Sequence, residues 1–190
     1  EEGSHVAEST EKVHSQSAYF VCLAEPELLD GKRGRFNLID TRSHRLQRVC
    51  RSSYAAETLG FEEAMDAAEL ARGYLADLRG LPMMGKSSRY STDQIRSVGV
   101  TDAKDCYDKI SSDNNSFGAQ KSLAFTVAWL RTLLRRPNVG IRWTATANMF
   151  ADGATKDMDT EQLRKVLREG EWSIQYDQAF VKTTVKKVKD

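Results

Sequence analysis

The chain has 190 residues, a length that suits one domain of ordinary size with tails and leaves little room for two domains. With 40% hydrophobic and 29% charged residues, the composition is typical of a globular protein and excludes wholesale disorder. The net charge of +1 excludes a broad electrostatic attraction to nucleic acid, so a surface that binds an acidic partner has to be local.

The cysteines and the apolar runs bear on the cellular environment. Cys22, Cys50 and Cys106 are far apart and lack the spacing of zinc ligands, which argues against a zinc site or a disulfide framework and favours a reducing compartment. No apolar run approaches the roughly 18 to 20 residues that span a bilayer, and no signal-like segment opens the chain. We therefore expect a soluble intracellular protein of the cytoplasm or nucleus, without a membrane partner.

The first part of the chain predicts an arm and a hairpin. Residues 1–16 are polar and rich in Ser, Glu and His, which is typical of a flexible N-terminal arm. Two β-favouring runs follow at residues 18–23 and 36–40, with turn-forming residues at 30–34 between them. These two runs predict an antiparallel β-hairpin.

A long helix and a short strand are expected next. Ser52 and Ser53 offer a helix N-cap, and small and apolar side chains recur at near-helical spacing through residues 54–78. After a loop rich in Gly, Pro and Ser, residues 95–100 predict a strand that carries Asp102 at its end.

The remaining part alternates helices and strands before a basic end. The expected elements are a short helix at 105–110, a strong helix at 119–135, a strand at 139–144, a helix that starts near Met149 with Thr146 or Asn148 as its cap, a helix at 161–168 closed by Gly170, and a strand at 172–176. Residues 159–190 are thus expected to add a helix, a short strand and a basic tail to the main domain.

Three carboxylates have positions that a two-metal nuclease would use. Glu57 falls in the first turns of the long helix, Asp102 just past an apolar strand, and Asp152 at the start of a late helix. Two-metal cleavage of a phosphodiester requires several carboxylates within about 4 Å, because the ions activate a water and stabilise the leaving oxygen. Helix starts and strand ends are rigid positions for such ligands.

The neighbours of these acids resemble the motifs of one family. Residues 49–57, VCRSSYAAE, are similar to the SSxxAE motif of the ribonuclease H domain of copia-type retrotransposon polyproteins, and Asp102 with the following AKD looks like its second acidic motif. Residues 143–156, WTATANMFADGATK, resemble its motif WVPTxxQLADxLTK, with Ala145 in place of the usual Pro and Met149 in place of the usual Gln.

The resemblance implies an α/β fold over residues 17–158, namely the ribonuclease H-like mixed sheet flanked by helices. In that family the acids that match Glu57, Asp102 and Asp152 are catalytic metal ligands. The resemblance therefore implies two Mg²⁺ or Mn²⁺ ions and hydrolysis of the RNA strand of an RNA/DNA hybrid.

Three further residues are expected to bind the substrate. Lys121 resembles a basic residue that the family has just ahead of its long helix, where it would meet phosphate. Ser53 and Lys156 accompany Glu57 and Asp152 in their motifs and are assigned the same role by the resemblance.

The three acids and Lys121 also have ordinary structural explanations. Glu57 is compatible with a solvated glutamate favoured by the helix dipole, Asp102 with a helix N-cap, and Asp152 with an acid in the first turn of a helix. Lys121 is compatible with an exposed lysine that binds nothing.

One part of the family pattern is not found. The family's first strand lies in the middle of the sheet and carries a fourth carboxylate, and Glu1-Glu2-Gly3 looks like the sequence just after that strand. A sheet without its central strand would expose unpaired backbone on two neighbours. Three explanations remain open: the chain is a fragment, another chain supplies the strand, or residues 172–177 fold back into the gap and offer Asp177 as a ligand.

Two functions follow from these observations. The first is a retroelement-derived ribonuclease H-like domain that binds RNA/DNA hybrid and cleaves its RNA strand when the first Asp is supplied. The second is a catalytically inactive module of the same fold, which serves as a structural or binding subunit of a larger assembly and whose sheet a protein partner completes.

Overall fold

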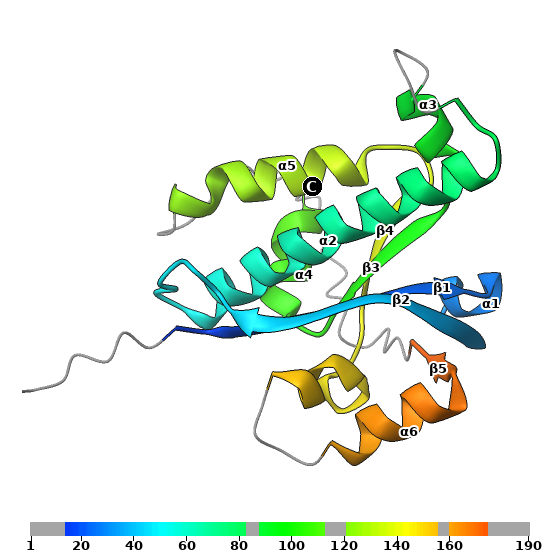
Figure 1. Ribbon diagram of the computed structural model, residues 1–190. Helices are drawn as coiled ribbons and strands as arrows, with labels where there is room; N and C mark the ends of the chain where they lie inside the picture. Colours follow the sequence, from blue (N-terminus) through cyan, green and yellow to red (C-terminus); the bar gives the residue numbers. More distant parts are fainter. Residues whose placement is uncertain (1–13, 83–87, 113–120, 156–159, 175–190) are drawn as a thin grey trace, which may run out of the picture.

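The computed structural model describes residues 14–82, 88–112, 121–155 and 160–174. It is a mixed α/β chain in which helices surround two small sheets (Figure 1), so the expected α/β class is confirmed. The elements in chain order are β1 (Gln16–Ala24), α1 (Pro26–Leu29), β2 (Arg33–Arg45), α2 (Ser53–Leu78), α3 (Ser88–Asp93), β3 (Ser97–Thr101), α4 (Lys104–Ser111), η2 (Lys121–Leu123), α5 (Ala124–Leu134), β4 (Val139–Trp143), η3 (Thr146–Asn148), η4 (Phe150–Ala154), α6 (Glu161–Glu169) and β5 (Glu171–Ser173).

Strands β1 and β2 form the predicted antiparallel hairpin. The pairing runs from Gln16 opposite Arg45 to Ala24 opposite Phe36, with an irregularity after Val21. Both strands are longer than the apolar runs, because backbone pairing continues into the polar residues that flank those runs. The hairpin connection contains α1, a single turn with Pro at its start, where the sequence had predicted only a turn.

The long helix α2 confirms the sequence prediction almost residue for residue. Ser52 is its N-cap, and the Ser52 hydroxyl oxygen accepts a hydrogen bond of 3.1 Å from the Ala55 N–H. This contact satisfies one of the N–H groups that have no partner inside the helix. The first helical residue, Ser53, is exposed and plays no part in this cap contact.

Replacement of Ser52 by alanine is expected to lower the free energy of unfolding by about 1 kcal/mol, because the cap hydrogen bond is lost. Ser53→Ala is the matched control and is expected to change stability by less than about 0.5 kcal/mol. Urea unfolding followed by circular dichroism would measure both. Equal effects of the two substitutions would contradict the assignment of the cap.

Strands β3 and β4 form a separate parallel pair, in register from Ser97 opposite Val139 to Thr101 opposite Trp143. Helices α4 and α5 connect the two strands, as parallel neighbours require. These helices and α2 enclose the larger apolar core. Its buried members are Phe61, Met65, Cys106, Ile110, Leu130 and Leu133.

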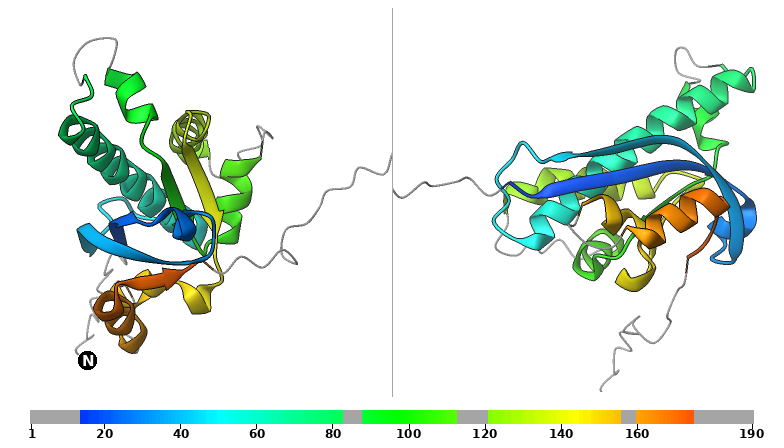
Figure 2. Two further views of the ribbon diagram at one scale, coloured as in Figure 1. Left: turned by 90° about the vertical axis from the view of Figure 1, so that its right-hand side faces the viewer. Right: turned by 60° about the horizontal axis from the view of Figure 1, so that its bottom comes forward.

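The hairpin is covered on both faces. Helix α2 lies on one face, and η4 and α6 lie on the other (Figures 1 and 2). A Cβ atom built on Gly60 of α2 would lie 2.7 Å from the Ser17 hydroxyl oxygen of β1. On the opposite face, the Phe20 ring of β1 packs edge-on against Phe150 of η4, with 5.3 Å between ring centroids. Strand β1 therefore has packing partners on both of its faces.

The described residues form two sheets and not the expected single mixed sheet. The orders are β1-β2-β5 and β3-β4, so the edge of β1 away from β2 and the edge of β3 away from β4 have no strand partner in the described part of the chain. The same turn of α2 lies beneath both edges, because Gly60 faces Ser17 of β1 and its neighbour Phe61 faces Gly99 of β3. The edges of β1 and β3 thus border one gap in strand pairing over this turn of α2.

Strand β5 lies at the outer edge of the hairpin sheet. Glu171 to Ser173 pair antiparallel with Arg33 to Arg35 of β2, so Trp172 and Ser173 do not fill the gap between β1 and β3. The fold-back explanation is wrong for these residues. Asp177, its proposed ligand, lies outside the described residues.

Three local predictions are corrected. The helix expected from Met149 is instead a pair of 3₁₀ turns, η3 and η4, with Met149 between them. Asn148 does not cap a helix: its side-chain amide donates a hydrogen bond of 2.6 Å to the Ser173 carbonyl and another to the Thr144 hydroxyl. Helix α3 begins inside the region that was expected to be a loop.

Candidate functional site

Glu57 lies on the face of α2 that meets the gap. It is three residues before Gly60 and four before Phe61, and residues at this spacing share one face of a helix. Gly60 and Phe61 contact β1 and β3 respectively, and the Glu57 side chain is exposed. Because α2 begins at Ser53, Glu57 is past the first turn, where the helix dipole acts most strongly. The helix dipole is therefore a weak explanation for a glutamate at position 57.

Asp102 lies at the carboxyl end of β3, as the sequence predicted. The Trp143 indole N–H, at the end of the neighbouring strand β4, donates a hydrogen bond of 2.9 Å to the Asp102 carbonyl oxygen. The Thr101 hydroxyl accepts a 3.1 Å bond from the Ala103 N–H. Asp102 is not the N-cap of α4, because that position belongs to Ala103, which makes no side-chain cap contact. The capping explanation is wrong in this structure.

Asp152 lies in η4, on the other side of the hairpin from α2. Its backbone carbonyl accepts bonds of 3.1 Å from the Thr155 N–H and 3.2 Å from the Thr155 hydroxyl. The Asp152 residue is half-buried. It is indeed an acid in the first turn of its element, but that element is a 3₁₀ turn and not the expected helix.

The expected substrate-binding residues are spread over separate elements. Ser53 is exposed at the start of α2, and Lys121 is exposed at the start of η2, ahead of α5. Lys156 lies outside the described residues. Lys121 therefore has the exposure that a phosphate contact requires.

The three carboxylates do not form a closed metal site by themselves. Among residues 14–82, 88–112, 121–155 and 160–174, no group of three or more His, Cys, Asp or Glu side chains is arranged to hold a metal ion. Glu57 and Asp102 come from elements that border the gap between β1 and β3, whereas Asp152 comes from the layer beneath the hairpin. The three predicted ligands therefore come from two different layers of the described chain.

Cys106 of α4 is the most deeply placed titratable group near Glu57. Burial raises the pKa of its thiol to about 12, a hydrogen bond from the Thr58 hydroxyl lowers it, and the Glu57 charge adds to the increase. The Thr58 oxygen and the Cys106 sulfur are 3.8 Å apart. Burial likewise raises the pKa of Cys22 to about 12. Neither thiol is a nucleophile at neutral pH.

We expect Cys22 and Cys106 to be alkylated by iodoacetamide at pH 8 on the order of 100-fold more slowly in the folded than in the unfolded chain, because their raised pKa values suppress the thiolate. The half-exposed Cys50 is the internal comparison. Mass spectrometry of native and urea-unfolded samples would measure the rates. Equal alkylation rates for all three thiols of the folded chain would contradict the raised pKa values of Cys22 and Cys106.

The same shifts predict how stability depends on pH. A raised thiol pKa stabilises the folded chain fully below the ordinary value of 9.0, and this contribution is lost as pH rises toward about 12. Urea unfolding between pH 8 and pH 11 should therefore show falling stability. The fall should be smaller in the Cys22→Ala/Cys106→Ala variant, and an identical slope would refute the linkage.

Sequence reasoning missed the tryptophan contact beside Asp102. Trp143 belongs to the strand predicted at residues 139–144, and its indole joins the ends of β3 and β4 through the Asp102 carbonyl. The signal available in the sequence was that Asp102 follows one predicted strand and Trp143 lies near the end of the next predicted strand. Parallel pairing brings such ends together.

In the described parts of the chain, no helix combines the length and the apolar character needed to cross a bilayer. Comparison of the chain with protein-family models, with curated proteins and with solved structures gives no match.

Proposed function

We propose that this chain is a ribonuclease H-like module derived from a copia-type retroelement, which binds RNA/DNA hybrid and hydrolyses the RNA strand when a further strand with a carboxylate completes its sheet. The motifs around Glu57, Asp102 and Asp152 support this proposal, together with the order hairpin, long helix, parallel strand pair and late acid.

One observation carries the proposal: two strand edges without a strand partner in the described chain face a gap over a single turn of α2. Strand β1 packs against α2 on one face and against η4 on the other, so a segment added at its edge would join an element already packed into the fold. Buried backbone N–H and C=O groups require partners, and an extended segment between β1 and β3 would supply them.

A segment in the gap would also lie between the elements that carry two of the predicted ligands. Glu57 is on the face of α2 that borders the gap, and Asp102 follows directly after β3. A carboxylate on the inserted segment would add the donor that the described residues lack for a metal ion. The segment would come from residues outside the described ranges or from another chain.

The chain's own residues have definable roles in this proposal. Asp102 is held at a fixed position because the Trp143 indole and the Thr101 hydroxyl order the backbone on either side of it. Lys121, exposed ahead of α5, would contact the phosphate backbone of a hybrid and contribute salt-dependent, sequence-independent affinity.

The second candidate is an inactive module that binds a protein partner through the same gap. It rests on the same two strand edges that have no strand partner in the described chain, because a segment of another protein could pair with them. In that case a partner strand would complete the sheet by adding to the edges of β1 and β3, a common mode of recognition. The three carboxylates would then be retained without catalytic use.

Hydrolysis of an RNA/DNA hybrid in Mg²⁺ tests the proposal. The assay would use the full chain, alone and with any protein that co-purifies with it, and end-labelled RNA. We expect cleavage that Asp102→Asn lowers at least about 100-fold, because loss of one metal ligand removes much of the charge stabilisation. Asp105→Asn, exposed on α4, is the matched control and should leave the rate unchanged.

The outcomes separate the two candidates. Cleavage by Asp102→Asn at the wild-type rate would sink the two-metal proposal. No measurable hybrid affinity at low salt, together with a protein partner present in fixed proportion, would favour the inactive module. Affinity for hybrid that falls steeply as salt rises would support nucleic-acid binding.

A further inference from the structure

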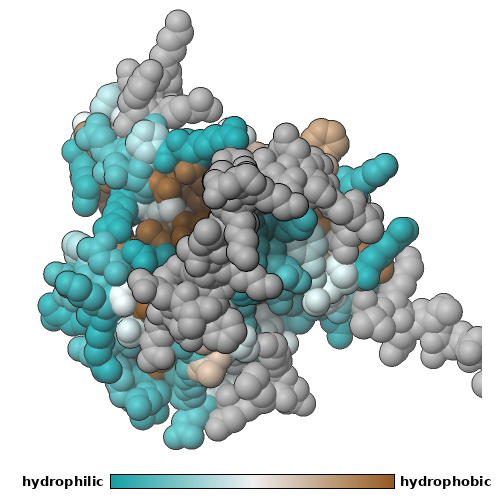
Figure 3. Space-filling model, turned by 180° about the vertical axis from the view of Figure 1, so that it is seen from behind, coloured by the Kyte–Doolittle hydropathy of each residue, from teal (hydrophilic) through white to brown (hydrophobic). Residues whose placement is uncertain are grey.

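Strand β4 borders a polar hollow, here called the β4 hollow. The residues that line it come from β4, from the start of β3 and from α4, and among them are Arg96, Tyr107, Gly140, Ile141 and Arg142. Its volume is about 340 Å³, and hydrophilic residues border a hollow on the side of the molecule seen from behind (Figure 3). Most of the lining is polar. The volume falls at the lower end of the range of roughly 300–1,000 Å³ that small-molecule sites occupy.

The charged side chains that line the β4 hollow are two arginines. Arg96 lies just before β3 and Arg142 lies in β4, and no carboxylate of the described residues belongs to the lining. Asp30, in the hairpin connection, forms an ion pair of 2.7 Å with Arg96. The hydrogen bond and the charge of Arg96 lower the pKa of Asp30, and the charges of Arg142 and Lys32 lower it further. Three cations therefore share one carboxylate, which leaves an excess of positive charge beside the hollow.

Arg142 carries the part of this charge that has no direct partner. Its side chain reaches the hairpin connection, where a terminal nitrogen would lie 3.4 Å from a Cβ atom built on Gly31. Arg142 is half-buried, yet it forms no hydrogen bond or ion pair with another residue of the described chain. A guanidinium that has lost part of its hydration gains from an acceptor that replaces the lost water. Its planar donors match the oxygens of a phosphate or carboxylate in pairs.

Neutral donors and open backbone complete the lining. The Tyr107 hydroxyl forms no hydrogen bond with another residue of the described chain. The Asn138 carbonyl and the Thr144 N–H bond to β3. The Ile141 N–H, an odd number of residues from both, therefore points to the outer edge of β4, where the described chain supplies no strand partner. A Cβ atom built on Gly140 would meet nothing closer than 4.0 Å, so a ligand can approach this backbone.

We propose that the β4 hollow binds a phosphate group, with Arg142 as its principal contact and with Arg96 and Tyr107 as further donors. A phosphate ester carries up to two negative charges and three strong acceptor oxygens, which match two arginines and neutral donors better than a single carboxylate does. The hollow also leaves room for the organic part of the ester. This inference goes beyond the proposed function, because none of the predicted metal ligands lines the hollow.

Titration of the isotope-labelled full chain with uridine monophosphate, followed by two-dimensional NMR at constant ionic strength, tests the phosphate site. We expect the amide signals of Gly140 and Arg142 to shift on binding. Arg142→Gln is expected to weaken the binding at least about tenfold, because a charge-assisted contact is lost. Arg51→Gln is the matched control: Arg51 is exposed ahead of α2, at the end of that helix away from the Arg72 contact with Ile95, and the affinity should not change. Equal affinities of the two variants would overturn the proposal.

Replacement of Asp30 by asparagine gives a second test, in which binding is expected to become tighter. Asp30→Asn should raise the affinity for uridine monophosphate about two- to tenfold, because Arg96 loses its competing partner and a repelling charge disappears. Asp77→Asn, the same change of charge at an exposed position of α2, is the control and should have no effect. Unchanged or weaker binding by Asp30→Asn would contradict the role of Arg96.

Further ligands identify the source of the phosphate group. Tighter binding of uridine monophosphate than of a short RNA without terminal phosphates would support a free phosphate ester, and the reverse order would support a nucleic-acid backbone. Uridine lacks the phosphate and should leave the amide signals in place, so shifts equal to those with uridine monophosphate would refute the site. Shifts with a glutamate-rich peptide and none with uridine monophosphate would overturn the proposal in favour of an acidic protein partner.

Discussion

Replacement of Arg72 by alanine is expected to lower the free energy of unfolding by about 3–5 kcal/mol, a large fraction of the stability of an ordinary domain. Arg72 lies in the second half of α2 and is 2% exposed. Its loss would remove the donor of the Ile95 and Thr92 carbonyl groups and one of the two arginines that pair with Glu69.

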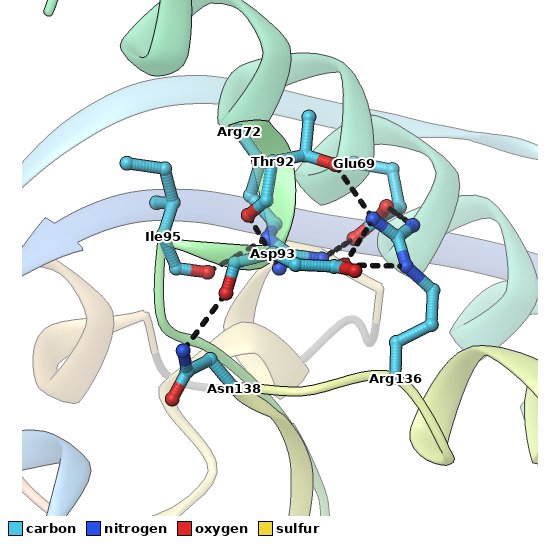
Figure 4. Close-up of polar contacts among 7 residues, drawn as sticks. All are labelled: Glu69, Arg72, Thr92, Asp93, Ile95, Arg136 and Asn138. Atoms are coloured by element: carbon cyan, nitrogen blue, oxygen red, sulfur yellow. Dashed lines mark hydrogen bonds and ion pairs between the residues drawn. The ribbon is translucent and has the colours of Figure 1, made fainter. Parts of the chain in front are cut away.

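Arg72 belongs to a network of hydrogen bonds and ion pairs that joins α2, the residues before β3 and the residues after α5 (Figure 4). The Arg72 guanidinium donates 2.9 Å to the Ile95 carbonyl and 2.7 Å to the Thr92 carbonyl, and it forms an ion pair with Glu69. Arg136, after α5, pairs with the same Glu69 and donates 2.7 Å to Asp93. The network fixes the segments that lead into β3 and β4.

Urea unfolding followed by circular dichroism would measure the Arg72→Ala effect. Arg79→Ala is the matched control, because Arg79 is an exposed arginine at the end of the same helix, and it should change stability by less than about 0.5 kcal/mol. Arg72→Ala and Arg136→Ala should be non-additive, since both contact Glu69. A loss below about 1 kcal/mol for Arg72→Ala would refute the structural role of the network.

Gly99→Ala is expected to lower the free energy of unfolding by about 1–3 kcal/mol, because the core would be overpacked. A Cβ atom on Gly99 would lie 2.6 Å from the Met65 sulfur and 2.6 Å from the Phe61 ring, and both side chains are buried. The gain from a stiffer unfolded chain, about 0.4–1 kcal/mol, offsets only part of this cost. Thermal and urea unfolding would measure the loss.

Gly140→Ala is the matched control on the paired strand. Its new methyl group would have Val98 as its nearest neighbour at 4.0 Å, an ordinary contact, so the change should be within about 0.5 kcal/mol. Phe61→Leu in the Gly99→Ala background should recover part of the loss, because the ring atoms that clash are removed. Equal stability of the Gly99 and Gly140 variants would contradict the packing of β3 on α2.

Gly99 and Arg72 both determine the position of β3. Gly99 allows β3 to approach Phe61 closely, and the Arg72 network holds the other end of β3. Together they hold β3 in place, and the edge of β3 borders the gap on which the proposed function depends. Variants that damage this packing should therefore also weaken the binding of any strand that fills the gap.

Elements with long regular patterns were predicted well from sequence. Helix α2 was expected at residues 54–78 and is found at Ser53–Leu78, because 26 residues of helical periodicity leave little ambiguity. The hairpin, β3, β4 and α6 with its left-handed Gly170 were also expected, since alternation, caps and turn residues are local signals.

Short elements were predicted poorly. The four residues of α1 and the 3₁₀ turns around Met149 carry too few residues for periodicity to identify them. The role of Arg72 was not predicted either, because an arginine in an amphipathic helix ordinarily lies at the surface. Its burial depends on carbonyl groups 20 and 23 residues further along the chain.

Some features of the candidate site were predictable from sequence and others were not. The sequence by itself determined the mixed α/β class, the hairpin, the long helix and the positions of Glu57 and Asp102 at a helix start and a strand end, because these follow from interactions between residues near in the chain. Only the tertiary structure decided that the strands form two sheets, that β5 pairs with β2, and that Asp152 lies in the layer beneath the hairpin. Those features depend on which edges and faces meet across long sequence separations, where packing and backbone pairing compete and local patterns carry no information.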